Sequence, residues 1–305
     1  MSLKSWILFT VLLMHDVMII GAGPAGLSAA LQLKRYGVDL VLLEGQRVGG
    51  LLNNANLVEN YPGFPGGIPG KDLINLFLEQ ITQLGVEFTM DEVQSLDYQN
   101  GSFKAVGQRS VYEANITIVA TGTRGKIPEG IIIPEGFHDR IASEIFPIRN
   151  VENKRIAIIG AGDLAFDYAL NLGRWNNVII LNRSEVVSCL PLLWDRAISI
   201  TSIQYQNLTR LEEIKPGAGG EILLAVNSPK GQTVISCDFL IFAVGRIPNA
   251  VYCSETLKGS MHDLEQKGKL YFIGDVKNGM YRQAAIAVGD GIKCAMMTYN
   301  TLKEK

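Results

Sequence analysis

Residues 17–26, VMIIGAGPAG, decide the fold of this 305-residue chain. The four apolar residues at its start predict a buried parallel strand, and residues 27–36 predict an apolar-periodic helix after the glycine turn. In such a turn the first glycine reverses the chain, the second lets a pyrophosphate approach the backbone, and the third lets helix and strand pack closely. The helix N-terminus adds free N–H groups for phosphates. The stretch therefore predicts a dinucleotide site.

An acidic residue follows at the distance that such a site requires. A second apolar strand is expected at residues 40–43, and it ends at Glu44. An acid at this strand end, about twenty residues after the turn, can bind a ribose hydroxyl. Glu44 therefore favours a dinucleotide site over an ordinary glycine-rich turn.

A second strand–turn–helix pattern occurs at residues 155–172. The apolar residues 156–159 enter Gly160-Ala161-Gly162-Asp163-Leu164-Ala165, and a helix is expected to continue to Leu172. Alanine is an accepted third residue of the motif. Two such turns, each between a strand and a helix, predict two bound dinucleotides.

The composition fits a two-domain α/β enzyme. A chain of 305 residues can bury two cores, and its 32 glycines supply many tight turns. The net charge of −2 indicates neither a nucleic-acid nor an anionic-membrane partner. The four cysteines, Cys189, Cys237, Cys253 and Cys294, contain no C-x-x-C pair. No disulfide framework or metal site is predicted, and the cytosol is the simplest compartment.

The first residues precede the predicted fold. Residues 6–14 are apolar and follow Lys4, as in a signal peptide, but no small-residue cleavage site comes next. The apolar run is also too short to span a bilayer. We expect residues 1–14 to lie outside both domains, as a non-native or disordered extension with the natural start near Met14. A peripheral membrane anchor is the alternative.

Five stretches together resemble a known family. They are the first glycine turn, Glu44, the glycine pair at 49–50, VENYPGFPGGIPG at 58–70 and VATG at 119–122. From about His15 to Lys305 the chain resembles the low-molecular-weight thioredoxin reductases of the pyridine nucleotide-disulfide oxidoreductase superfamily, and VENYPGFP is the most specific match. The resemblance implies an α/β fold with two Rossmann-like, three-layer ββα nucleotide-binding domains, the second inserted in the first. It places an FAD domain at 15–122 and 246–305 and an NAD(P) domain at 123–245, and it implies a homodimer.

The resemblance also implies the cofactor-binding residues. Among them, Val93 is expected at the adenine, Asp275 at the ribityl and phosphate region, and the helix opening at residues 281–285 at the N1–O2 edge of the flavin. The FAD candidates are Gly21, Gly23, Pro24, Ala25, Gly26, Glu44, Gly45, Gly50, Leu51, Asn60, Val93, Ala120, Thr121, Gly122, Gly274, Asp275, Arg282, Gln283 and Ala284. The NAD(P) candidates are Gly160, Gly162, Asp163, Leu164, Asn182, Arg183 and Gly245.

The choice between NADPH and NADH stays open. The strand expected at residues 178–181 ends at Asn182-Arg183-Ser184, where relatives that use NADPH gather several basic residues. Arg183 can bind a 2′-phosphate, or it can be a solvated surface residue. No acid that would favour NADH stands at the strand end, because Glu185 lies beyond it.

The redox cysteines of the resembled family are missing. That family carries C-x-x-C followed by an acid just before the second nucleotide strand. Counting back from Gly160, the positions hold residues 143–146, Ser-Glu-Ile-Phe, followed by Pro147. Ser143 and Phe146 cannot replace cysteines, because thiol–disulfide exchange requires a thiolate. No side chain is assigned as a catalytic residue.

The leading hypothesis is an FAD-dependent NAD(P)H oxidoreductase with an acceptor outside the protein. The acceptor would be a ferredoxin- or flavodoxin-type carrier, a quinone or oxygen. One alternative is a non-catalytic flavin-binding or redox-sensing protein. The other is thioredoxin-disulfide reductase activity with the thiols supplied by a partner.

Overall fold

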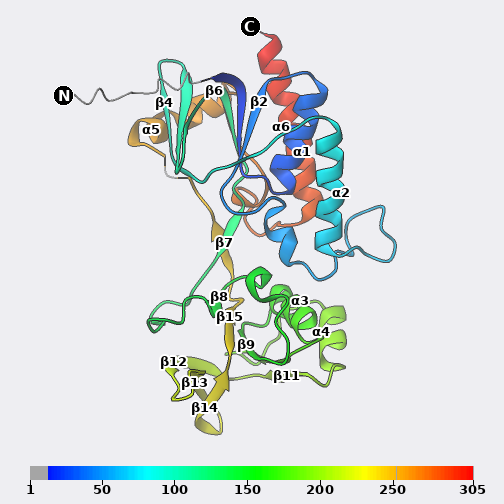
Figure 1. Ribbon diagram of the computed structural model, residues 1–305, viewed down its shortest axis with the longest axis vertical. Coiled ribbons are helices and arrows are strands. Elements are labelled where there is room, and N and C mark those ends of the chain that lie inside the picture. The colour runs from blue at the N-terminus through cyan, green and yellow to red at the C-terminus, as the bar shows by residue number, and fades with distance from the viewer. Residues whose placement is uncertain (1–12, 252, 305) are drawn as a thin grey trace, which may run out of the picture. The chain divides into compact units, whose positions relative to one another are not determined.

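The chain forms two compact units, shown in Figure 1. The computed structural model describes residues 13–251 and 253–304. Of these, unit 1 comprises 13–50, 74–122 and 248–304 (252 excepted), and unit 2 comprises 51–73 and 123–247. Each unit is built on its own sheet.

Unit 1 contains a seven-stranded sheet in which a parallel part continues into an antiparallel meander. The order is β3 (Thr89–Met90), β2 (Leu40–Glu44), β1 (Met14–Ile20), β6 (Val111–Val119), β5 (Ser102–Gly107) and β4 (Val93–Gln99), with β17 (Leu270–Phe272) also paired to β6. Strand β6 changes partner along its length: residues 111–114 pair with β5, and residues 117–119 pair with β17.

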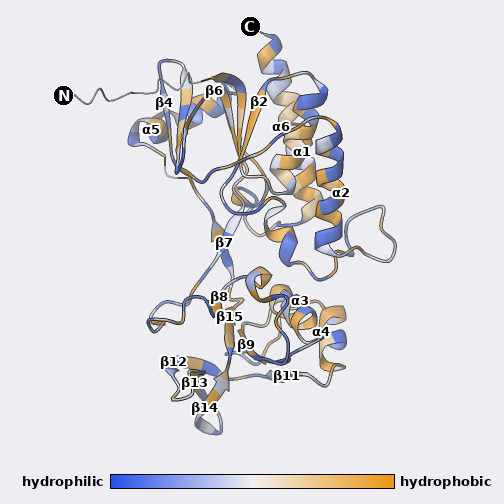
Figure 2. Ribbon diagram, in the orientation of Figure 1, coloured by the Kyte–Doolittle hydropathy of each residue, from blue (hydrophilic) through white to orange (hydrophobic). Residues whose placement is uncertain are grey.

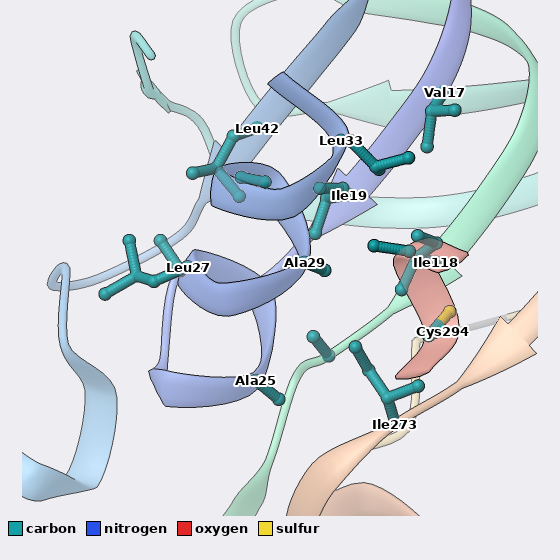
Figure 3. Packing of buried hydrophobic residues seen from close by; sticks show 14 of the residues in the cluster. Val17, Ile19, Ala25, Leu27, Ala29, Leu33, Leu42, Ile118, Ile273 and Cys294 are labelled. Carbon is teal, nitrogen blue, oxygen red and sulfur yellow. The ribbon is translucent and has the colours of Figure 1, made fainter. Parts of the chain in front are cut away.

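Both faces of this sheet are covered where residues 17–20 of β1 lie, so all four of these residues are apolar and buried. Val17 and Ile19 of β1 pack towards α1 (Pro24–Arg35), α2 (Gly70–Gln83) and α6 (Ala284–Lys303), as the close view in Figure 3 shows for α1 and α6. Met18 and Ile20 pack towards the meander and α5 (Glu255–Gln266) on the other face. Alternate side chains of a strand point to opposite faces, and this arrangement makes three layers.

Unit 2 repeats the architecture. Its parallel sheet has the order β11 (Ile203–Gln206), β10 (Asn177–Leu181), β9 (Arg155–Ile159), β15 (Phe239–Phe242) and β8 (Ile141–Ala142). Helices α3 (Asp163–Leu172) and α4 (Pro191–Ile198) cover one face. The other face is covered by a meander of β12 (Arg210–Pro216), β13 (Ile222–Ser228) and β14 (Gly231–Cys237). Strands β7 (Thr123–Gly125) and β16 (Arg246–Pro248) form a separate pair.

The predicted fold class is confirmed, with differences at element boundaries. The residue pattern predicts separate strands at 110–114 and 115–120, whereas the structure has one strand, β6, because its change of partner needs no break in the chain. The last helix begins at Ala284 instead of residue 281, because Gln283 has an extended backbone (φ −137°). Helices α4 and α5 had no sequence prediction.

The N-terminal expectation is corrected at one residue. Met14 was placed in the extension, yet it belongs to β1 and pairs with Glu113 of β6. Leu13 precedes β1 and is exposed, and residues 1–12 lie outside the described residues. In the described part of the chain, no helix combines the length and the hydropathy needed to cross a bilayer. Figure 2 shows the apolar residues concentrated in the parallel strands and on the helices packed against them.

The unit boundaries differ from the expected domain boundaries at two places. Residues 51–73 group with unit 2, whereas the expected FAD domain ran unbroken from 15 to 122. Residues 246 and 247 also group with unit 2. The hydrogen bonds of Asn54, Asn56 and Glu59 to residues of unit 2 explain the grouping of the first segment.

Candidate functional site

Two positions of the first glycine turn in unit 1 have no room for a side chain. Gly21 has φ +105°, and a Cβ atom there would lie 2.5 Å from the carbonyl oxygen of Ala120. A Cβ atom on Gly26 would overlap the carbonyl oxygen of Gly21. These contacts draw α1 against the ends of β1 and β6, as the motif predicts.

Gly23, between them, has no such constraint from the protein itself. A Cβ atom added to Gly23 meets nothing within 4 Å among the described residues, and its φ of −77° suits any amino acid. Gly23 is the N-cap of α1, where the described residues provide no side-chain capping hydrogen bond. Open space beside an uncapped helix N-terminus fits a dinucleotide pyrophosphate. The turn therefore fits the pyrophosphate of the expected FAD.

Glu44 lies at the end of β2, where a ribose is expected. Its carboxylate accepts the backbone N–H groups of Ala22 (2.8 Å), Gln46 (2.8 Å) and Arg47 (3.0 Å). A carboxylate has about four lone-pair positions. With three of them taken, one acceptor position is left for a ribose hydroxyl.

The neighbouring strand ends bring further FAD candidates together. Gly274 follows β17 with φ +70°, and a Cβ atom there would lie 2.8 Å from the Cβ atom of Ala25. The Ala120 N–H donates to Ile20, and the Gly122 carbonyl oxygen accepts the N–H of Asn249. The other candidates of unit 1 are Pro24 in the first turn of α1, Gly45 and Gly50 after β2, Val93 at the start of β4, Thr121 after β6, Asp275 after Gly274, and Arg282, Gln283 and Ala284 at the start of α6.

Two FAD candidates are not brought into this unit. Leu51 and Asn60 belong to the segment 51–73, which the structure groups with unit 2. The sequence analysis had assigned them to the same domain as the glycine turn. The hydrogen bonds of their neighbours to α3 and α4 account for this difference.

The turn in unit 2 is built in the same way. Gly160 has φ +128°, its N–H donates to the carbonyl oxygen of Leu181 (3.0 Å), and a Cβ atom there would overlap the carbonyl oxygen of Ala243. Helix α3 then begins at Asp163, and Leu164 lies in its first turn. The described residues provide no side-chain cap at Gly162. This turn therefore also fits a pyrophosphate.

A loop that the sequence analysis missed borders this second turn. Ser188 donates its backbone N–H to the carbonyl oxygen of Ala161 (3.0 Å), and its Oγ would lie 3.6 Å from a Cβ atom on Gly162. Leu190 donates its N–H to the Asp163 carboxylate (2.7 Å). No sequence motif marks these residues, because their partners lie 27 positions earlier.

Asn182 has a different environment from the one expected of a cofactor ligand. It is 5% exposed, and its amide donates to the Val186 carbonyl oxygen (3.0 Å) and the Tyr205 hydroxyl (2.9 Å). Its Oδ1 accepts the N–H of Ser184 (3.1 Å). The amide therefore shapes the loop after β10, while Arg183 is exposed beside it. Gly245, the last NAD(P) candidate, follows β15 with φ +110°.

The position of the expected cysteine pair holds a polar cluster in unit 2. Arg246 donates to the Glu144 carboxylate (2.9 Å) and to both the hydroxyl (2.9 Å) and the carbonyl oxygen (2.8 Å) of Thr123. Asn54 donates to Glu144 (3.4 Å) and accepts the N–H of Phe146 (2.9 Å). We call Arg246, Glu144, Thr123 and Asn54 the Arg246 cluster. Its hydrogen bonds hold residues 143–146 at the Glu144 carboxylate and at the Phe146 backbone N–H.

The segment 51–73 is also bound to α3 through Asp167. This carboxylate accepts the backbone N–H groups of Asn56 (3.0 Å) and Leu57, and Arg174 donates to the side chain of Asn56 (2.9 Å). Burial raises the pKa of Asp167 to about 6, and the two N–H donors and Arg174 only partly oppose it. Asp167 is therefore a half-buried acid whose pKa is raised to about 6.

This titration predicts a pH dependence of stability for unit 2. Because the folded pKa is above the unfolded value of 3.8, the folded state binds the proton more tightly, and stability falls as the pH rises from about 4 to 6. The loss is about 3 kcal/mol at most, since one pKa unit corresponds to about 1.4 kcal/mol. Asp167→Asn should flatten this slope in urea unfolding followed by tryptophan fluorescence, because Trp175 and Trp194 lie in unit 2.

The control is Asp195→Asn, which changes an exposed acid of α4 in the same unit. It should leave the pH dependence as in the wild type. An unchanged slope in Asp167→Asn would show that another group titrates.

Comparisons with known proteins agree with this geometry. Residues 15–291 match the family model described as pyridine nucleotide-disulphide oxidoreductase. The chain is 30% identical to the thioredoxin reductase of Rickettsia prowazekii, over 92% of this chain and 96% of that protein. It is 27% identical to the thioredoxin reductase of Borreliella burgdorferi, over 95% and 92%. The crystal structure of Lactococcus lactis thioredoxin reductase superimposes with a TM-score of 0.82 and 27% identity, covering 95% of this chain and all of that one.

Proposed function

Because the chain belongs to the pyridine nucleotide-disulphide oxidoreductase family, we propose that it passes electrons from NAD(P)H through FAD to an acceptor outside the protein, without a disulfide of its own. It is a flavin-dependent oxidoreductase, with FAD and a nicotinamide dinucleotide as cofactors. The relatives are named for thioredoxin, a disulfide substrate. The proposal departs from them at the acceptor.

One observation supports this departure: the sequence contains no C-x-x-C pair, and Ser143 and Phe146 stand where the resembled family carries its redox cysteines. The chain's four cysteines are distant in sequence, and all are free thiols. Burial raises the pKa of Cys237 and of Cys294 to about 12, and it also raises the pKa of Cys189 and of Cys253. Thiol–disulfide exchange proceeds through the thiolate, which is scarce at neutral pH for such groups.

The residues of the chain would bind and orient both cofactors. In unit 1, Gly23 and the first turn of α1 would receive the FAD pyrophosphate, and Glu44 a ribose hydroxyl. In unit 2, Gly162 and the start of α3 would receive the pyrophosphate of the nicotinamide cofactor. Arg183 follows the end of β10 and is the cation that could bind a 2′-phosphate on the adenosine ribose. When bound, the isoalloxazine ring supplies hydride acceptance and onward electron transfer. The resemblance implies that the N-terminus of α6 would face the edge of the flavin ring that gains negative charge on reduction. A helix dipole would stabilise that charge.

The acceptor class follows from the lack of a disulfide. A flavin can deliver electrons to a ferredoxin- or flavodoxin-type carrier, to a quinone or to oxygen without a dithiol. By resemblance we expect the protein to act as a homodimer, and the scattered cysteines suggest the cytosol.

An anaerobic reductive titration tests the proposal. The purified protein should show flavin absorption that one equivalent of dithionite per FAD removes completely, because no disulfide takes a second electron pair. NADPH or NADH should bleach the same bands, and comparing the two gives the nucleotide preference. A second equivalent consumed per FAD would reveal a dithiol enzyme.

Two outcomes would overturn the proposal in different ways. A colourless protein that binds no added FAD would exclude a flavoenzyme. A flavoprotein that neither nucleotide bleaches would favour the sensor alternative. If NADPH or NADH bleaches the flavin, the acceptor is identified by comparing steady-state turnover with ferredoxin, flavodoxin, a quinone and oxygen.

A further inference from the structure

Asp290, in the second turn of α6, is hydrogen-bonded to the turn that carries Asp275. The Oδ2 atom of Asp290 accepts the backbone N–H of Gly274 (3.1 Å) and the side-chain amide of Asn278 (2.6 Å). The two donors come from opposite ends of the turn 274–278. The sequence analysis gave Asp290 no role.

The backbone of this turn needs such an acceptor. Gly274 is buried and has φ +70°, so its N–H points away from the β17 ladder, which ends with the bond from Ile273 to Val119 (3.0 Å). A buried N–H without an acceptor is destabilising, and a carboxylate is a stronger acceptor than a neutral group. Asp290 therefore fixes the conformation in which the chain leaves β17 and presents Asp275.

A glycine next to Asp290 explains how α6 comes close enough. A Cβ atom on Gly291 would overlap the carbonyl oxygen of Ala25 and would lie 3.0 Å from the N atom of Ala29. Without that atom, α6 packs directly on the backbone of the first turns of α1. Ala25, Ile273 and Cys294, all labelled in Figure 3, belong to the cluster buried between these elements.

Three parts of the candidate flavin site thus meet at Asp290 and its neighbour. They are the glycine turn at Ala25, the turn that carries Asp275, and the helix whose N-terminus begins at Ala284. A displacement of one would move the others, because α6 packs on the backbone of α1 at Gly291 and is hydrogen-bonded to the turn 274–278 through the Asp290 side chain.

We propose that Asp290 is a positioning residue of the FAD site, acting through Gly274 and Asn278 to set the place of Asp275 and of the α6 N-terminus. The inference rests on the proposed function, since it assumes that FAD binds unit 1. Asp290 itself contacts no cofactor in this role. Its carboxylate exerts its effect through the two hydrogen bonds.

The test compares Asp290→Ala with Asp290→Asn in the full chain. Alanine removes the acceptor, whereas asparagine keeps one oxygen in place and should rescue the site. For Asp290→Ala we expect the Kd of FAD to rise by about tenfold or more, because the turn that carries Asp275 loses its charge-assisted hydrogen bonds. At saturating FAD, the visible circular dichroism and the reduction potential of the flavin should also shift. Asp290→Asn should bring all three readouts back towards the wild type.

Controls separate a positioning role from a structural one. Asp263→Asn changes an exposed acid of α5 in the same unit and should leave every readout unchanged. The melting temperature of the apoprotein is measured for each variant, and FAD binding is measured well below it. If Asp290→Ala does not fold, Asn278→Ala removes one of the two bonds and should shift the same readouts less.

The outcome that overturns the inference is specific. Wild-type Kd, dichroism and potential in a folded Asp290→Ala, or in Asn278→Ala where that variant replaces it, would show that the two hydrogen bonds do not position the flavin. A loss confined to apoprotein stability would have the same meaning. Failure of the proposed function is distinguished from this, because it would appear first as a wild-type protein that binds no FAD or whose flavin no nucleotide bleaches.

Discussion

Replacing Gly26 by alanine should strongly destabilise unit 1, whereas replacing Gly23 by alanine should preserve the fold and abolish FAD binding. A Cβ atom on Gly26 would overlap the carbonyl oxygen of Gly21, and α1 would have to move away from the sheet. We expect a loss of about 3 kcal/mol or more, at the upper end for overpacked sites. Gly23 has an ordinary φ and open space, so its Cβ atom would meet only the pyrophosphate.

The two variants are compared by urea unfolding of the apoprotein and by flavin fluorescence on titration with FAD. Gly37→Ala is the matched control, since Gly37 has φ +74° with no atom within 4 Å of its Cβ position among the described residues. It should cost about 1 kcal/mol from backbone strain and leave FAD binding intact. Wild-type FAD affinity in Gly23→Ala would place the pyrophosphate elsewhere.

Replacing Arg246 by methionine should destabilise unit 2 by about 3 kcal/mol. The side chain of Arg246 is 10% exposed, and it is paired with Glu144, whose side chain is 32% exposed. Removing one partner of a buried ion pair leaves the other uncompensated, which costs about 3–5 kcal/mol, less here because Glu144 reaches water. Thr123 would lose two hydrogen bonds as well.

Tryptophan fluorescence in urea measures this loss, since Trp194 packs against Phe166 and Tyr205 in the core of unit 2. The control is Arg155→Met. Arg155 also makes three side-chain hydrogen bonds, to Asp238 and Ser236, but its side chain is 50% exposed. It should cost less than about 1 kcal/mol. Equal losses of unfolding free energy in the two variants would show that burial does not strengthen the interactions of Arg246.

What the sequence predicted correctly depends on neighbouring residues. The two glycine turns and the acid at the end of β2 are local patterns, and each appears in the structure with the expected backbone. The strand patterns are also local, because burial on both faces makes residues 17–20 of β1 and 156–159 of β9 apolar without interruption.

What it missed depends on partners far along the chain. Glu144 and Arg246 are separated by 102 positions, and nothing near either residue indicates the pair. Asn182 was correctly placed at a strand end, but Tyr205 of the neighbouring strand determines where its amide points. Asp290 is closer to its partner Gly274, 16 positions away, and the glycines on both sides of it in α6 are the one signal that could have singled it out.

The place of β17 and α6 in unit 1 has a consequence for biosynthesis. Strand β17 pairs with β6, and α6 packs on α1, so the core of unit 1 needs segments from both ends of the chain. The sheet of unit 2 comes from one continuous stretch, 141–242. On the ribosome, that sheet can therefore form while β1 and α1 still await β17 and α6, which are synthesised later. Contacts between such distant segments form slowly, so the nascent N-terminal half is the part of this protein that most needs protection from aggregation.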